Sequence, residues 1–219
     1  MDGTSETNSL EVRWFGTGAP PGELDEWIAA LGSVDTSTRT DSYLSPFGPS
    51  LNVKRRGGGG ESIEVKRRLG ELGRRDLAPG VAGNVEQWYK WSFPLDRAPD
   101  PTSADRTGLW LPIEKTRTLY ALDGAEIGSL AGNVSGPTTA EVEVTEVRTV
   151  SETAWTCCLE VAGRPDDLES VFDAVAAELF GADFPVELEP DESFGYPEWL
   201  RRVTANTGPS LEILVPSNQ

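Results

Sequence analysis

Leu51-Asn-Val-Lys-Arg-Arg56 and Ser62-Ile-Glu-Val-Lys-Arg-Arg68 are two similar segments separated by a run of glycines. Each alternates apolar and polar residues, which is typical of a β-strand, and the glycines predict a hairpin turn between them. Val53 should lie opposite Val65, because a slip of one residue would send one apolar set to the other face of the sheet. The sequence therefore predicts a hairpin with a loop over 57–61, an apolar face in the core and an opposite face of Lys, Arg and Glu.

Other segments show the same alternation or a helical spacing. Further strands are predicted over 10–15, 42–44, 85–93, 109–122, 140–150 and 155–161, with a late strand at 211–215. Helices are predicted over 24–31, after Pro165 (stripe Leu168, Val171, Phe172, Val175 and Leu179) and at about 197–203. Loops are expected at 35–41, 69–84 and 123–139. About eight mostly consecutive strands and two or three flanking helices indicate an α+β fold with an antiparallel sheet or barrel.

Composition excludes several kinds of site. The 219 residues include 36 Asp+Glu, 19 Lys+Arg, two Cys and no His, for a formal net charge of −17. Without His there is no Ser-His-Asp system and no His-ligated metal, and two adjacent Cys cannot alone form a four-cysteine site. The length favours a single domain, which we place at 10–203, between a disordered tail at 1–9 and a C-terminal tail at 204–219.

The N-terminus is polar and acidic, unlike a signal peptide, and no segment approaches the ~18 apolar residues that span a bilayer. We therefore expect a cytoplasmic protein that does not contact membranes. The negative charge also argues against DNA as a partner. An excess of acidic residues with only four lysines is typical of a halophilic protein with an acidic surface. The alternative is an acidic protein that functions at ordinary salt concentrations. The sequence does not indicate an oligomeric state.

The charge is unevenly distributed. Residues 51–75 carry eight bases and three acids, whereas residues 123–219 carry four bases and nineteen acids. All four lysines, at 54, 66, 90 and 115, fall within predicted strands. In an open sheet their faces would be solvated. In a closed sheet they would line a lumen, where unpaired charges are unfavourable unless a ligand or water neutralises them.

The order of the predicted elements resembles that of the CYTH group, the triphosphate tunnel metalloenzymes. The opening strand LEVRWF at 10–15 resembles the glutamate-bearing first strand of that family, and LNVKRR and IEVKRR resemble its basic strands. KTR at 115–117 is similar to its Lys-x-Arg strand, and EVEV at 141–144 with CLEV at 158–161 is similar to its closing half. Arg13 and Phe15 depart from the family, because its first strand carries Glu-x-Glu-x-Lys.

The resemblance implies an eight-stranded antiparallel tunnel that binds a triphosphate-type anion, either a phosphorylated small molecule or polyphosphate. Members hydrolyse triphosphates, or cyclise ATP, with a divalent metal, so Mg²⁺ or Mn²⁺ is an expected cofactor. The cationic candidates for the anion are Arg13, Lys54, Arg56, Lys66, Arg68, Lys90, Lys115 and Arg117. The candidate metal ligands are Glu11, Glu143 and Glu160.

The sequence allows more than one role for the basic residues and more than one function for the fold. Lys66 either contacts phosphate or forms a salt bridge with Glu64 or Glu86, and Arg13 is either an anion ligand or a counter-ion for Glu11 and Glu160. The departures at Arg13 and Phe15 favour a non-catalytic binding module of the same fold over a hydrolase. A third hypothesis is an RNA-binding basic hairpin, which requires Lys54 and Lys66 to face outward.

Overall fold

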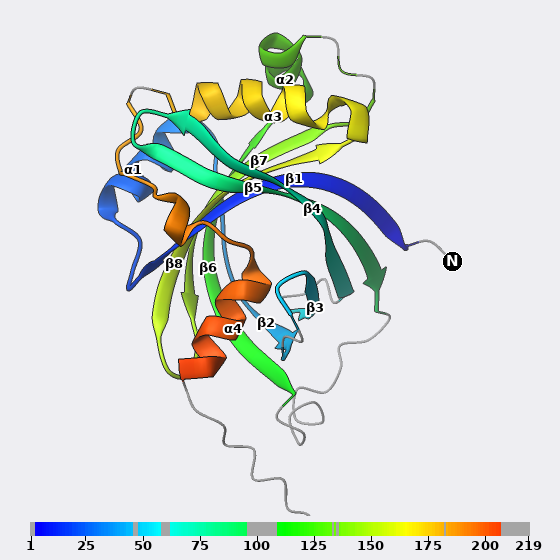
Figure 1. Cartoon of the computed structure of the whole chain (residues 1–219), viewed down its shortest axis with the longest axis vertical. Coiled ribbons are helices and arrows are strands. Elements are labelled where there is room, and N and C mark those ends of the chain that lie inside the picture. Colours follow the sequence, from blue (N-terminus) through cyan, green and yellow to red (C-terminus); the bar gives the residue numbers. More distant parts are fainter. Residues whose placement is uncertain are drawn as a thin grey trace, which may run out of the picture.

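The computed structural model describes residues 3–45, 48–57, 62–95, 109–132, 134, 136–181 and 183–206. Within these ranges eight antiparallel strands form one closed barrel in the order β1-β5-β4-β3-β2-β6-β7-β8 (Figure 1). The expected α+β fold, with an eight-stranded antiparallel barrel and flanking helices, is therefore confirmed.

The strands are β1 (Ser5–Thr17), β2 (Asp35–Leu44), β3 (Leu51–Arg56), β4 (Ser62–Ala78), β5 (Val81–Pro94), β6 (Trp110–Leu122), β7 (Thr139–Arg148) and β8 (Thr153–Gly163). The helices are α1 (Gly22–Leu31), α2 (Gly124–Ala131), α3 (Pro165–Leu179) and α4 (Tyr196–Asn206), with a 3-10 turn at Pro190–Glu192. In the part of the chain that the structure describes, every helix is too short or too polar to cross a bilayer.

The main hydrophobic core lies outside the barrel, between its wall and the helices α1, α2 and α3. Outward side chains of β1, β7 and β8, such as Val12, Val144 and Leu159, form one cluster with Val171 and Phe172 of α3, and all five are at most 2% exposed. The predicted apolar stripe of α3 is therefore confirmed, and Figure 1 shows α3 lying across the barrel with α2 beyond it. Because successive strand residues alternate between faces, this packing leaves Glu11 and Arg13 of β1, and Glu141 and Glu143 of β7, inside the barrel.

A second, smaller cluster attaches α4 to the barrel. Trp199 stacks on Phe15 of β1, with ring centroids 5.3 Å apart and an interplanar angle of 5°. Leu200 and Val203 belong to the same cluster, together with Ile113 of β6. This packing fixes the first residue of α4, Tyr196, at the barrel interior.

Several expected boundaries are wrong. Residues 5–9 belong to β1 and not to a tail, and 35–41 belong to β2. The expected connection at 69–84 consists mainly of the long antiparallel pair β4 and β5, in which bulges absorb the glycines. The segment 123–139 contains α2, which begins with a capping box between Asp123 and Glu126. The predicted strand at 211–215 lies outside the described residues.

The hairpin of β3 and β4 has the predicted register, with Val53 opposite Val65 and Arg56 opposite Ser62. Its orientation is opposite to the prediction. Leu51 on the apolar face is 39% exposed, whereas Glu64 on the charged face is 7% exposed. The charged face of the hairpin therefore forms part of the barrel interior. The main hydrophobic core lies outside the barrel, against β1, β7 and β8, and does not cover the apolar face of the hairpin.

Candidate functional site

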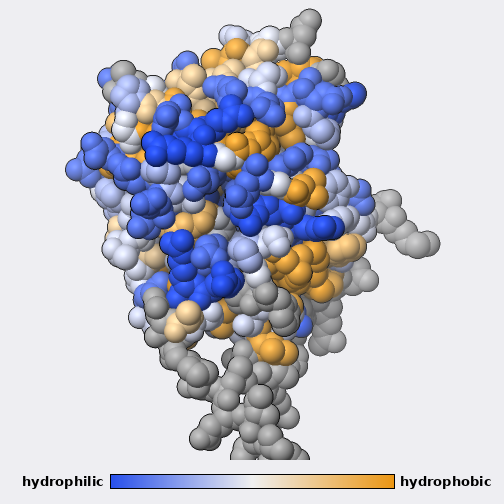
Figure 2. Space-filling model, in the orientation of Figure 1, coloured by the Kyte–Doolittle hydropathy of each residue, from blue (hydrophilic) through white to orange (hydrophobic). Residues whose placement is uncertain are grey.

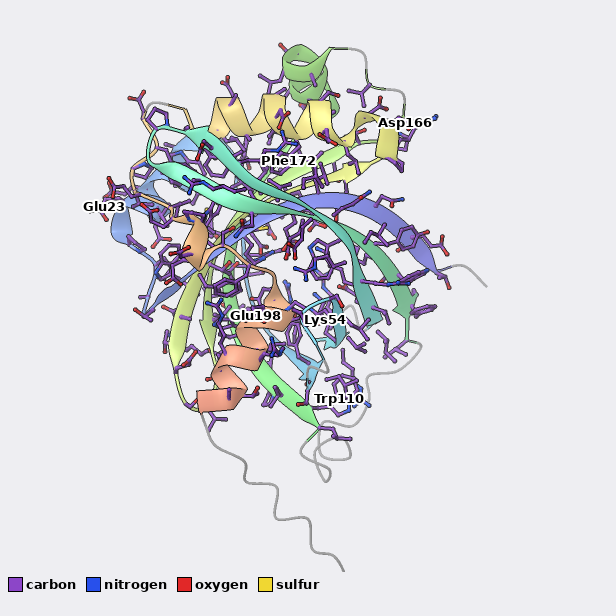
Figure 3. All side chains as sticks on the ribbon, in the orientation of Figure 1. Glu23, Lys54, Trp110, Asp166, Phe172 and Glu198 are labelled. Atoms are coloured by element: carbon purple, nitrogen blue, oxygen red, sulfur yellow. The ribbon has the colours of Figure 1, made fainter. Side chains whose placement is uncertain are left out.

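The barrel encloses a cavity of about 310 Å³. Its lining includes eight cationic side chains, from Arg13, Arg39, Lys54, Arg56, Lys66, Lys90, Lys115 and Arg117. It also includes four carboxylates, from Glu11, Glu64, Glu141 and Glu143. In a chain with a net charge of −17, this interior surface carries an excess of positive charge. Figure 3 shows side chains from many strands filling the barrel, with Lys54 labelled among them.

Most of the predicted cationic residues meet at this cavity. All four lysines line it, as do Arg13, Arg56 and Arg117. Arg68 does not, because its guanidinium is held by Glu86 and by Glu71, the latter at 2.6 Å. Lys54 and Lys66 therefore face inward, which removes the condition that the RNA-binding hairpin hypothesis set for these two residues.

Arg13 joins two of the predicted metal ligands. Its Nε donates to Glu11 Oε1 at 2.8 Å and its Nη1 donates to Glu143 Oε1 at 2.8 Å, and Arg13 is 6% exposed. Burial alone would raise the pKa of Glu11, but the charges of Lys66 and Arg13 outweigh it and hold the pKa well below its usual value. The same balance, with Arg13 as the main partner, lowers the pKa of Glu143. Arg13 is thus an internal counter-ion for Glu11, as one of its two interpretations required, and its other partner is Glu143 in place of Glu160.

Lys66 lies between the remaining carboxylates. Its Nζ donates to Glu11 Oε2 and lies 3.2 Å from Glu160 Oε1. Burial disfavours the charged amine, yet these two carboxylates raise the pKa of Lys66 above its usual value. The salt bridges expected from sequence, to Glu64 or Glu86, are replaced by these contacts.

Asp41 is a second centre of charge that the sequence did not reveal. Its side chain is fully buried, with Arg39 Nε at 3.2 Å, Lys115 Nζ at 3.7 Å and Lys54 Nζ at 3.8 Å from its oxygens. Burial would raise the pKa of Asp41, but the three cations lower it. Lys54 Nζ lies closer to Glu64, at 3.0 Å, and Arg56 also contacts Glu64, so two carboxylates face four cations in this region of the cavity.

Lys115 has an unusual environment for a lysine. It is 5% exposed, its Nζ donates to Tyr43 Oη at 2.5 Å, and it lies 4.0 Å from the ring centroid of Tyr196. Burial and the nearby charge of Lys54 hold the pKa of Lys115 well below its usual value, despite Asp41. The surroundings of Lys115 therefore disfavour its charged form.

Lys90 and Arg117 are the lining cations with the weakest partners. Lys90 forms no ion pair with any carboxylate in the described ranges, although it lies directly opposite Lys66 on β4. Among the residues that the structure describes, the carboxylate oxygens nearest to Arg117 are 3.8 and 3.9 Å away, from Asp35 and Glu143. Its Nε is buried without a hydrogen-bond partner. Both cations lie close enough to Glu141 to lower its pKa, although burial and the neighbouring Glu160 raise it more.

The predicted metal ligands do not form an open coordination set. Both oxygens of Glu11 are engaged by Arg13 and Lys66, and one oxygen each of Glu143 and Glu160 is engaged in the same way. Among the described residues no three Asp, Glu or Cys side chains are grouped closely enough to hold a metal ion. A divalent cation at Glu11, Glu143 and Glu160 would have to displace the guanidinium of Arg13.

Sequence reasoning missed Arg39, Asp41, Tyr43 and Tyr196. The first three alternate along β2 in a segment that also places Thr at every second position, and β-branched residues in alternation are a strand signal. Tyr196 comes from α4, and its phenol oxygen is buried without a partner at the cavity. No local pattern connects α4 with the barrel interior, so only the tertiary structure could identify it.

Comparison with known proteins does not identify a family. No family model and no curated protein matches the sequence. Two solved structures from Pyrococcus horikoshii OT3 show a distant similarity to this chain. The PH1012 protein is 14% identical, with 87% of this chain and 98% of that chain covered and a TM-score of 0.46. The PH1819 protein is 12% identical, with 90% and 99% covered and a TM-score of 0.47.

Proposed function

We propose that the barrel cavity binds a phosphorylated anion of the triphosphate type, and that the protein acts as a binding module for it. The observation that carries this proposal is that eight cations line the cavity but only six carboxylates face them: four in the lining, with Asp41 and Glu160 as ion-pair partners. Lys66 opposite Lys90 is a like-charged cross-strand pair, in which Lys66 has Glu11 and Glu160 as partners while Lys90 has no carboxylate partner among the described residues. A polyanion within the cavity would supply the missing negative charge.

The least neutralised cations suggest where the ligand is held. Lys90 lacks a described ion-pair partner and Arg117 has an unsatisfied buried Nε, so both retain capacity for phosphate oxygens. The buried hydroxyl of Thr145, directly opposite Arg117, is also without a hydrogen-bond partner. We infer that these three side chains contact the anion directly, while Arg13 and Lys66 remain with their carboxylates.

Metal-dependent hydrolysis of the same ligand is the second candidate function. Glu141 and Glu160 are directly opposed on β7 and β8, and no described cation pairs with Glu141. Mg²⁺ is commonly held by one or two carboxylates together with substrate phosphates, so this pair fits Mg²⁺ or Mn²⁺ better than the set of Glu11, Glu143 and Glu160. A bound divalent ion would neutralise phosphate charge and polarise the phosphoryl group.

Calorimetric titration with inorganic triphosphate tests the binding proposal. We expect saturable binding, and at 100 times Kd a stabilisation of about 2.7 kcal/mol, which raises the melting temperature by roughly 5–11 °C in a domain of this size. Lys90→Gln and Arg117→Gln should each weaken binding at least about tenfold. Arg148→Gln is the matched control, because Arg148 is a half-exposed strand arginine outside the cavity lining. Absence of binding at low and at molar salt would refute the proposal.

The same preparation distinguishes binding from turnover. Phosphate release is measured with triphosphate, ATP and thiamine triphosphate, with and without Mg²⁺ or Mn²⁺, for the native chain, Lys66→Ala, Glu160→Gln and Glu141→Gln. A binding module gives no metal-dependent release. Release that depends on metal and is lost in Glu141→Gln and Glu160→Gln would establish the second candidate, whereas release that none of the substitutions changes would indicate a contaminant.

A further inference from the structure

The outer surface of β3, β4 and β5 carries a second set of residues that the cavity does not use. We call it the outer platform and define it by Arg55, Val65, Arg67, Tyr89, Trp91 and Phe93. These side chains point away from the barrel, since they alternate along their strands with the cavity-lining residues. Figure 2 shows hydrophobic residues gathered over the β3–β4 part of the visible face, bordered by strongly hydrophilic ones.

The described helices leave this surface open. Phe93 is 41% exposed and Leu51, at its margin, is 39% exposed. Helix α3 reaches β4 at Arg75, beyond the outer platform, and α4 enters at the barrel interior. Neighbouring large apolar groups that stay in contact with solvent are typical of an interaction site.

The aromatic residues of the outer platform form a row. Tyr89, Trp91 and Phe93 occupy alternate positions of β5, so their side chains follow one another at about 6.8 Å along the strand. The rings of Tyr89 and Trp91 are 4.6 Å apart at 54°. Tyr89 and Trp91 are half-buried and Phe93 is exposed, so each ring of the row keeps a part in contact with solvent.

The charge of the outer platform is opposite to that of the whole chain. The outward residues of β3 and of β4 up to Leu69 include Arg55 and Arg67 and no carboxylate. Neither arginine pairs with a carboxylate in the described ranges, and Arg55 Nε is buried without a partner while its guanidinium covers the ring of Trp110 at 4.2 Å. Glu6 of β1 lies directly opposite Trp91 and accepts a hydrogen bond from the Tyr89 hydroxyl, so one carboxylate adjoins the aromatic row.

These features select one kind of partner. A symmetric contact between two copies would bring the arginines of one platform towards those of the other, which is unfavourable. An anionic chain with flat apolar groups matches both the guanidinium groups and the aromatic row. Sheet faces that stack two or three bases on aromatic side chains are a recurrent way of holding single strands, and stacking tolerates any base.

We propose that the outer platform binds single-stranded nucleic acid, with bases stacked on Tyr89, Trp91 and Phe93 and with phosphates contacted by Arg55 and Arg67. This site is separate from the cavity and does not depend on the function proposed for it. Two phosphate contacts predict a slope of roughly −1.4 for the logarithm of affinity against the logarithm of salt concentration, and stacking predicts binding that persists when salt is raised.

Fluorescence anisotropy of labelled ten-nucleotide oligo(U) and oligo(dT) tests the proposal on the full chain. We expect micromolar binding of at least one of them, and comparison of the two shows whether the sugar matters. Trp91→Ala should weaken binding at least about fivefold, and Trp91→Phe should retain most of it. Arg67→Gln should reduce the salt slope by roughly 0.7, whereas Arg148→Gln, on another strand, should not change it.

Two further measurements make the outcome decisive. At constant ionic strength, Lys90→Gln and saturating inorganic triphosphate should leave oligonucleotide binding unchanged, because both act in the cavity. Circular dichroism of each variant confirms that the barrel is intact. Absence of binding to both oligonucleotides, binding unaffected by Trp91→Ala, or concentration-dependent dimerisation that Trp91→Ala abolishes would overturn the proposal.

Discussion

Replacement of Arg13 by Met should expose how strongly the barrel interior depends on one guanidinium. Arg13 is 6% exposed and contacts Glu11 and Glu143 at 2.8 Å each. Loss of one partner of a buried ion pair typically costs about 3–5 kcal/mol. Glu11 keeps Lys66, whereas the nearest cation left to Glu143 among the described ion pairs is Arg117 at 3.9 Å, so we expect about 3 kcal/mol. That corresponds to a melting temperature lower by roughly 6–12 °C.

The effect should depend on pH in a defined direction. In the native protein the pKa values of Glu11 and Glu143 are depressed, so their contribution to stability is present above the unfolded pKa of about 4.3 and is lost as pH falls through the folded values. Without Arg13, burial raises the pKa of Glu143, and its charged form then destabilises the fold increasingly as pH rises above about 4.3. The loss of stability should therefore be larger at pH 7 than at pH 4.5.

Urea unfolding of native protein and Arg13→Met at both pH values measures this difference. The double variant Arg13→Met/Glu143→Gln should recover about 1–3 kcal/mol, since it removes the stranded charge. If Arg13→Met does not fold at pH 7, the double variant and the single variant at pH 4.5 still supply the comparison. A loss below about 1 kcal/mol, or one independent of pH and of Glu143→Gln, would refute the reasoning.

Three further predictions follow from the same contacts. Lys115→Met should keep or raise stability at pH 7 by up to about 2 kcal/mol. Because the folded pKa of Lys115 is depressed, the native protein gains stability as pH rises towards the unfolded pKa of about 10.4, and urea unfolding from pH 7 to 10 should show this slope flattened in the variant. Asp41→Asn should cost about 2–4 kcal/mol in urea at pH 7, with a smaller loss in saturating triphosphate, because a polyanion replaces the missing charge. Gly83→Ala should lower stability by about 1–3 kcal/mol in thermal unfolding, since a Cβ would come within 2.5 Å of Val12 and 2.6 Å of Trp14.

The sequence predicted strands and register better than it predicted which face is buried. Alternation at Val53 and Val65 fixed the pairing of the hairpin, because a slip would separate its apolar residues. Alternation cannot say whether the apolar face packs on helices or faces solvent, and the structure leaves Leu51 exposed while Glu64 is buried. That choice depends on where α3 and the long strands lie, which is information from distant parts of the chain.

The candidate site shows the same division. The scarcity of lysine directed attention to Lys54, Lys66, Lys90 and Lys115, and all four line one cavity. Asp41 lies in the segment 35–41, whose polar composition predicts a loop, so the sequence does not indicate that its carboxylate contacts three of the surrounding cations. Partners of this kind come from barrel closure, which brings β2 beside β6 and β3 and has no local signature.

The arrangement of charge inside the barrel links stability to ligand binding. Arg13 and Lys66 are fully served by carboxylates, so removing either should harm the fold with or without ligand. Lys90 has no described partner, and its charge lies opposite that of Lys66, so the empty barrel gains little from it. Lys90→Gln should therefore leave the unfolding free energy of the empty protein unchanged or slightly higher, while it removes much of the stabilisation by triphosphate. A residue that contributes to the fold only when the anion is bound is a binding residue, whereas one that contributes equally in both states is structural, and comparison of Lys90 with Lys66 separates the two roles.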